Sequence, residues 1–255
     1  VVGRLFWDRI VSFIQSEEGN GADPQLIPQS LSSLRNRELV YRHEESTFIG
    51  AIEYLFKHDV LREVTYESVV KRLRKSYHRL VANWLIANCG DRISEYSGLI
   101  AKHLEMGHRK EQACQYFLQS GEYALRNYAN QEAENQFRRA LNLECTKIDK
   151  PKSLEGLGDS LERQAHHEEA IQIWKDSIDL YQKQVNWESV ARLYAKSARA
   201  AWLIDASRSL NICLEGLECI KEKSKSHEVA MLLHETGREY HFIGKTNEAS
   251  EYCQI

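Results

Sequence analysis

The chain has 255 residues, of which 42% are hydrophobic and 28% are charged, a balance typical of a folded globular protein and not of a disordered one. Its net charge of -3 provides no general attraction to nucleic acid or to an anionic membrane, so neither class of partner is expected. Only 3 prolines and 13 glycines interrupt a sequence rich in good helix formers, which predicts a mostly helical fold.

The 6 cysteines include no C-x-x-C pair and no zinc-finger spacing with histidines, and most fall on apolar positions of expected helices. Free cysteines of this kind indicate a reducing compartment, so we expect a cytoplasmic protein. No apolar run has the length of a membrane span, and no signal peptide opens the sequence. Because the first residue is Val1 and the last repeat stops within a helix, we expect this chain to be part of a longer polypeptide.

Apolar residues at helical spacing predict helices over residues 4–18 and 25–37. Two short runs of β-branched and aromatic type follow, residues 38–42 and 53–57, and the polar segment between them is prone to turns. Helix, helix and hairpin in this order are the outline of a winged helix. The sequence therefore predicts a small winged-helix domain over residues 1–92.

A basic run over residues 71–79 contains five Lys or Arg and no acid, and it lies on an expected helix. In a winged helix, such a run raises the question of DNA contact. However, the helix that enters the DNA groove usually precedes the wing, and the helix in that place offers only Arg35 and Arg37. We therefore favour a solvated or intramolecular face, which would also carry His78.

Residues 112–143 form the unit around which the second part of the chain is organised. They indicate two helices joined by a tight turn, with small residues where the helices cross and aromatic residues beside them. The small residues include Gly121 on the first helix and Ala133 on the second, and the large residues are Phe117 and Phe137.

The same offsets recur along the chain, which is the test that a repeat hypothesis must pass. Moving 37 residues on replaces Gly121, Ala133 and Phe137 by Gly158, Ala170 and Trp174, and two looser copies follow. This pattern resembles the tetratricopeptide repeat (TPR), although no unit has the usual terminal proline and the periods exceed the usual 34 residues. The resemblance predicts a TPR-like α-α superhelix over residues 93–255, with about four units after a leading half-repeat and a truncated end.

Catalytic motifs are not evident. Gly244, Lys245 and Thr246 resemble the end of a phosphate-binding loop, but Glu239 stands where the first glycine is required, so we interpret them as a turn. Two histidine pairs, His103 with His108 and His166 with His167, lack metal-ligand spacing and are interpreted as exposed turn residues. We expect a non-enzymatic chain with no cofactor and no metal.

The segment 53–69, EYLFKHDVLREVTYESV, followed by Arg74, His78 and the run 81–84, is similar to signalling ATPases of the STAND class (signal transduction ATPases with numerous domains). In particular it resembles the bacterial ATPases associated with class III adenylyl or guanylate cyclases, and Phe56-Lys57-His58 is the most specific part. The resemblance implies a regulatory region in which a winged helix packs on the nucleotide-binding domain of the same polypeptide. It also makes His58 a candidate to reach the nucleotide phosphate. That nucleotide domain is absent here, so the resemblance assigns no ATP hydrolysis to this sequence.

The first helix of each repeat is expected to line a concave surface on which a peptide or partner helix binds. The pattern places a basic and aromatic group there, and we hypothesise that it holds an acidic partner segment. The group comprises Arg192, Lys196, Arg199, Trp202 and Arg238. An ordinary solvated face is the competing interpretation. The alternative function is a DNA-binding regulator in which the repeats sense an effector.

Overall fold

The computed structural model describes residues 1–19, 25–143, 145–221 and 225–254, with side chains as far as residue 252. The fold is mostly helical, as the composition predicts. It divides into two compact units, Val1–Tyr116 and Phe117–Ile255, and each unit is described by itself below. The division falls within helix α6, whereas the domain boundary expected from the sequence, between residues 92 and 93, remains a prediction.

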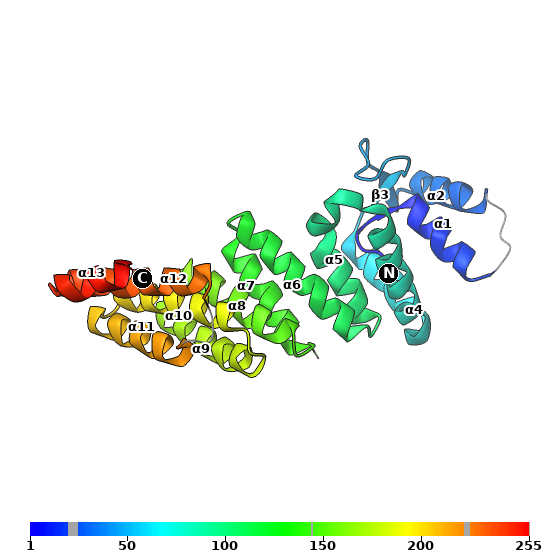
Figure 1. The fold of residues 1–255 in the computed structure, drawn as a ribbon. Helices are drawn as coiled ribbons and strands as arrows, with labels where there is room; N and C mark the ends of the chain where they lie inside the picture. The colour runs from blue at the N-terminus through cyan, green and yellow to red at the C-terminus, as the bar shows by residue number, and fades with distance from the viewer. Residues whose placement is uncertain (20–24, 144, 222–224, 255) are drawn as a thin grey trace. The chain divides into compact units, whose positions relative to one another are not determined.

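Both units consist of short elements in regular succession (Figure 1). The elements before the division are β1 (Leu5–Trp7), α1 (Asp8–Glu17), α2 (Leu26–Asn36), β2 (Val40–Arg42), β3 (Glu53–Phe56), α3 (Asp59–Ser68), α4 (Lys71–Asn88), the 3-10 turn η1 (Gly90–Arg92) and α5 (Ile93–Met106). The elements from the division onward are α6 (Lys110–Arg126), α7 (Asn130–Asn142), α8 (Asp149–Glu162), α9 (His167–Lys183), α10 (Trp187–Trp202), α11 (Ala206–Ile220), α12 (His227–Phe242) and α13 (Thr246–Gln254).

A three-stranded antiparallel sheet forms the base of the first unit, in the order β1-β3-β2. The predicted hairpin is confirmed, because Tyr41 pairs with Leu55. The prediction of one helix over residues 4–18 is wrong at its start, where Leu5–Trp7 forms a strand on β3 and the helix begins only at Asp8. Tertiary pairing decides this segment, since bulky apolar residues suit a half-buried strand as well as a helix.

Helix pairs with closely approaching backbones build the second unit. A side chain on Gly121 would lie 2.6 Å from the ring of Phe137, and one on Gly158 would overlap the indole of Trp174. Phe137 is completely buried and Trp174 is nearly so. The small and large residues that the repeat pattern singles out therefore meet in the core, as predicted. Within this unit, α10 packs against α9, α11 and α12 (Figure 1).

The segment that resembles a phosphate loop is a turn, as predicted. Gly244 adopts a left-handed conformation with φ of 81° between α12 and α13, both of which are helices. Glycine accepts this conformation without the strain that a side chain imposes.

Cysteine chemistry departs from the expectation of free thiols. Cys89 and Cys213 carry free thiols, whereas Cys114 and Cys145 are disulfide-bonded. The cysteines therefore do not by themselves indicate a reducing compartment. Among the helices in the described part of the chain, none combines the length and the apolar character that crossing a bilayer requires.

Candidate functional site

Charged side chains connect the first helices of successive repeats in the second unit. We call this surface the first-helix face and define it by Glu155 and Asp159 on α8, by Arg192, Lys196, Arg199 and Trp202 on α10, and by Glu235, Arg238 and Phe242 on α12. Each of these helices presents residues three or four positions apart, so their side chains share one side of the helix.

The α8 end of this face is an ion-pair cluster. Arg192 donates to both carboxylate oxygens of Glu155, over 2.8 and 3.0 Å. Lys196 Nζ donates to Glu155 at 3.0 Å and to both oxygens of Asp159 at 2.8 Å. The indole Nε1 of Trp174 also donates to Asp159, at 3.2 Å. The cluster thus ties α8 to α10 and, through Trp174, to the packed core.

Electrostatics keeps Glu155 ionised in this cluster. Burial opposes the charge, but the hydrogen bond from Arg192 and the positive charges of Lys196 and Arg192 hold the pKa of Glu155 at about 2. A carboxylate that is paired in this way contributes stability at neutral pH, and its partners are not available to a ligand without breaking the pair.

The α12 end carries a looser second cluster. Arg199 lies 3.5 Å from Glu235, and Arg238 Nη2 lies 3.0 Å from both Glu235 and Glu239. The carboxylates are buried, whereas the Arg199 side chain is 43% exposed. Arg199 is therefore the basic residue of this face that is held least tightly and that solvent reaches most easily.

Aromatic residues adjoin this exposed arginine. The rings of Trp202 and Phe242 lie 5.6 Å apart between centroids, and the two residues are 38% and 59% exposed. Leu203, Ile204 and Ile243, in the turns that follow the two helices, are also exposed. Aromatic side chains left open in this way on consecutive repeats form an apolar patch, and such patches are typical of interaction sites.

The five partner-site residues predicted from the sequence all lie on α10 and α12. The same first-helix projection places Glu155 and Asp159 on this surface, but it does not predict that they pair with Arg192 and Lys196. The carboxylates of Glu235 and Glu239 on α12 were missed. His58, the candidate from the family resemblance, is the exposed residue that precedes α3, where its backbone oxygen accepts from Leu61 and Arg62.

A buried histidine pair in the first unit was also missed. His78 on α4 and His103 on α5 face each other with their Nδ1 atoms 2.8 Å apart, and the Tyr66 hydroxyl lies 3.2 Å from His78 Nε2. Both histidines are almost fully buried, so the expectation of an exposed His103 is wrong. Of the two interpretations for the face that carries His78, its contacts agree with the intramolecular one. Burial lowers the pKa of His78 to about 4 and that of His103 to about 3.

The basic run on α4 makes intramolecular contacts. Arg74 donates to the backbone oxygens of Val69 and Glu67, and Arg79 donates to that of Gly107. These contacts agree with the intramolecular interpretation of this run. Across the residues that the structure describes, no cluster of three or more His, Cys, Asp or Glu side chains has an arrangement suited to a metal ion.

No protein-family model matches the sequence, and no curated protein matches it. Among solved structures, the nearly identical TPR-like repeats of a Podosopora anserina protein match with a TM-score of 0.51 and 13% identity, over 72% of this chain and 91% of that one. The apo form of RapI matches with a TM-score of 0.54 and 15% identity, over 96% of this chain and 62% of RapI. A STAND protein with a tetratricopeptide repeat sensor from Pyrococcus horikoshii has a TM-score of 0.45 at 14% identity, over 96% and 40% of the two chains. The first of these matches shows that the chain has a TPR-like helical-repeat fold.

Proposed function

We propose that the chain is a non-catalytic scaffold whose repeats bind a protein or peptide partner on the first-helix face. The observation that carries the proposal is the exposed pair Trp202 and Phe242, which stands beside Arg199 on the first helices of two consecutive repeats. Stacked repeats generally use this kind of surface for extended partners.

The composition of the patch defines the partner. The two exposed aromatic rings can pack against a large apolar side chain of the partner. Buried aromatic contacts dominate the binding energy of most interfaces. The Arg199 guanidinium lies 3.5 Å from Glu235, and its side chain is 43% exposed. A carboxylate of the partner can therefore compete for it by a charge-assisted hydrogen bond. The partner is therefore an acidic segment with one or two large apolar side chains. Arg192, Lys196 and Arg238 support the face through their ion pairs, and Arg199 and Trp202 make the direct contact.

A peptide array tests this assignment. The probes are labelled peptides in which a single Trp, Phe or Leu is surrounded by Asp and Glu, together with the same peptides carrying Asn and Gln instead. We expect the wild-type chain to retain the acidic set and the variants Trp202→Ala and Arg199→Ala to bind at least about tenfold more weakly.

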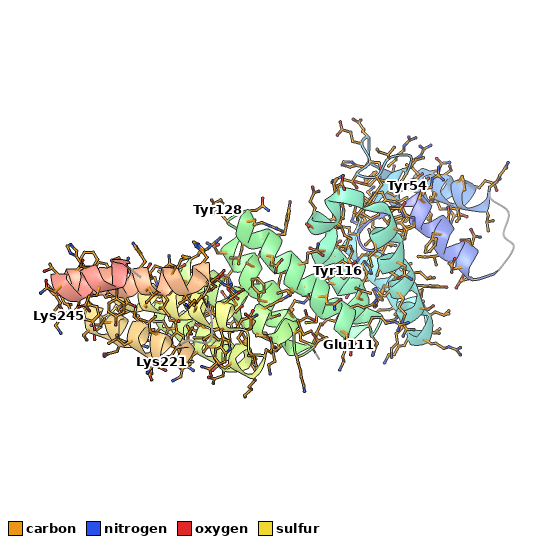
Figure 2. All side chains as sticks on the ribbon, in the orientation of Figure 1. Tyr54, Glu111, Tyr116, Tyr128, Lys221 and Lys245 are labelled. Atoms are coloured by element: carbon orange, nitrogen blue, oxygen red, sulfur yellow. The ribbon has the colours of Figure 1, made fainter. Side chains whose placement is uncertain are left out.

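The matched control is Tyr128→Ala. Tyr128 is an aromatic residue that is 84% exposed in the turn between α6 and α7 (Figure 2), whereas the patch lies on α10 and α12 and in the turns that follow them. We expect this variant to bind like the wild type. Equal affinity of the wild-type chain, Trp202→Ala and Arg199→Ala for the acidic peptides would discard the assignment of this surface.

We also propose that this region regulates a larger STAND-type signalling ATPase, with the first unit as a winged-helix-like domain that packs on the nucleotide-binding domain of the same polypeptide. The order β1, α1, α2, β2, β3 and the resemblance of residues 53–69 support this proposal. A pull-down of that nucleotide domain by the full 255-residue chain tests it. His58→Ala should weaken the retention in the presence of ATP, and an unaltered yield would exclude a role for His58.

A further inference from the structure

A cavity of about 460 Å³ lies in the second unit, and none of its lining residues belongs to the first-helix face. Its walls are α9 and α11, which are the second helices of two consecutive repeats, and α10 contributes to its lining. The volume falls in the range of roughly 300 to 1,000 Å³ that is typical of small-molecule sites.

Side-chain contacts between the walls bound this cavity on two sides. Near the start of the two helices, Arg208 on α11 donates to both carboxylate oxygens of Glu168 on α9, over 2.7 and 2.8 Å. Near their ends, Gln182 on α9 lies 3.0 Å from Cys219 on α11. The helices are thus connected on both sides of the cavity.

An unsatisfied polar group lines this space. The Ser197 side chain on α10 is 4% exposed, and its Oγ has no hydrogen-bond partner among the described residues. A buried hydroxyl without a partner costs free energy, and a ligand or an ordered water that supplies the missing bond recovers it. Ser197 Oγ therefore offers a hydrogen bond to a molecule that enters the cavity.

The other residues that line the cavity include aliphatic side chains and side chains of both positive and negative charge. Ile171, Ile178 and Ile212 provide aliphatic surface. Lys175 and Asp179 stand one helical turn apart on α9 and place opposite charges at the cavity, and Asn211 adds an amide from α11.

We propose that the cavity binds a small aliphatic zwitterion of dipeptide size. Lys175 and Asn211 hold its carboxylate, Asp179 holds its ammonium group, the isoleucines contact its side chains, and Ser197 Oγ bonds its amide. Lys175 and Asp179 lie one helical turn apart with opposite charges, so a ligand that carries one charge of each sign can pair with both of them at once. This inference is independent of the partner surface proposed above, because the two sites share no residue.

Titration with the dipeptide leucyl-leucine tests the inference on the full chain carrying ¹³C-labelled isoleucine methyl groups. We expect saturable shifts of the methyl signals of Ile171, Ile178 and Ile212. The capped analogue N-acetyl-leucyl-leucinamide, which has the same side chains but neither charge, should bind at least about tenfold more weakly.

Two variants on α9 form a matched pair for this titration. Asp179→Asn removes the proposed ammonium partner and should weaken leucyl-leucine binding at least about tenfold. Asp176→Asn changes an exposed aspartate on the same helix that does not line the cavity, and it should leave binding unchanged. Because both positions are exposed, the fold is expected to tolerate both changes.

Three outcomes would overturn the inference. One is the absence of isoleucine shifts at millimolar leucyl-leucine, which would mean that the cavity holds only water. The second is equal binding of the capped analogue, and the third is equal weakening by the two aspartate variants. Since Trp202→Ala should not affect this titration, failure here and failure of the partner surface are distinguishable.

Discussion

At the scale of single residues, the closest packing in the second unit is a glycine against an aromatic ring. The Trp174 indole occupies the space in which a side chain at Gly158 would lie. Replacing Gly by Ala inside a helix normally stabilises by roughly 0.5 to 1 kcal/mol. Here we expect Gly158→Ala to lower the free energy of unfolding by roughly 1 to 3 kcal/mol, because the added methyl overpacks the crossing. Urea denaturation measures this difference.

A double variant separates overpacking from other effects. In a Trp174→Leu background the indole is absent, so Gly158→Ala should cost less than in the wild-type background. Equal costs in the two backgrounds would show that the indole does not determine the identity of residue 158.

The histidine pair predicts a pH dependence. Burial lowers the pKa of His78 and His103 to about 4 and about 3, whereas unfolded histidines titrate near 6.5. Between these values the unfolded chain binds more protons, so the free energy of unfolding decreases as the pH falls. We expect a loss of roughly 2 kcal/mol per histidine between pH 7 and pH 5, measured by urea denaturation followed in the first unit.

The variant His78→Asn provides the comparison for this measurement. It removes one titrating group, so the loss of stability between pH 7 and pH 5 should become smaller even if the variant is less stable at pH 7. A slope identical to that of the wild type would mean that His78 does not contribute to the pH dependence.

Sequence reasoning succeeded for residues whose partners lie at a fixed offset. Gly121 and Phe137 are 16 positions apart in one unit, and Gly158 and Trp174 repeat this spacing in the next, so a pattern along the chain revealed both contacts. It failed for His103, whose partner is 25 residues earlier on another helix and outside the repeat. A single histidine in an amphipathic helix carries no signal of its partner.

At the scale of helices, we expect two ion pairs to contribute differently to the free energy of unfolding: the pair that joins α8 to α10 and the pair that joins α9 to α11. Glu155 is a partly buried carboxylate that two cations share, whereas Glu168 pairs with Arg208 at the surface. We expect Glu155→Gln to destabilise by roughly 1 to 3 kcal/mol, because it leaves Arg192 and Lys196 beside a neutral amide. Glu168→Gln should cost less than about 1 kcal/mol, since exposed pairs contribute little.

Thermal and urea unfolding of the two variants check this difference at pH 7. Because the pKa of Glu155 is lowered to about 2, its contribution is complete above the unfolded value of 4.5 and is lost as the pH falls toward 2. The difference between the wild type and Glu155→Gln should therefore shrink below pH 4.5. Equal effects of the two variants at pH 7 would contradict the role of burial.

Helix positions were more predictable than the turns that end them. The turns at Tyr128, Ala165 and Val185 all place a residue with φ near 60° after a helix, although glycine usually takes that position. In each turn a backbone N–H bonds back five residues, as from Asn186 to Tyr181, so the geometry repeats without its usual sequence signal. The sequence pattern therefore predicted the helices, but it did not predict the left-handed residues that end them.

At the scale of the whole molecule, the repeat pattern was sufficient to predict a TPR-like helical fold, because each repeat unit packs mainly on its neighbours. The cavity between α9 and α11 was not predictable. Its lining combines residues from three helices, and no spacing within one unit relates Ser197 on α10 to Asp179 on α9. Sites of this kind depend on how consecutive repeats pack on one another.

The distribution of charge over the chain discriminates between the proposed protein-binding scaffold and the alternative of a DNA-binding regulator. The chain carries a net charge of -3, and Arg74 and Arg79 of the basic run donate to backbone oxygens within the first unit. We therefore expect no binding of random-sequence duplex DNA at about 150 mM salt. Fluorescence anisotropy over a range of salt concentrations measures this, since any residual binding at low salt must weaken steeply as counterions are restored.

A DNA-binding regulator makes the opposite prediction, and it names the helix responsible. In that case α2, which precedes β2 and β3, would enter the groove, and binding at about 150 mM salt would be lost in Arg35→Gln with Arg37→Gln. The control pair Lys71→Gln with Lys75→Gln removes the same charge from α4 and would leave the binding nearly unchanged. If both double variants lost binding to the same extent, the interaction would be a property of overall charge, because groove recognition depends on the position of the arginines and not on their number.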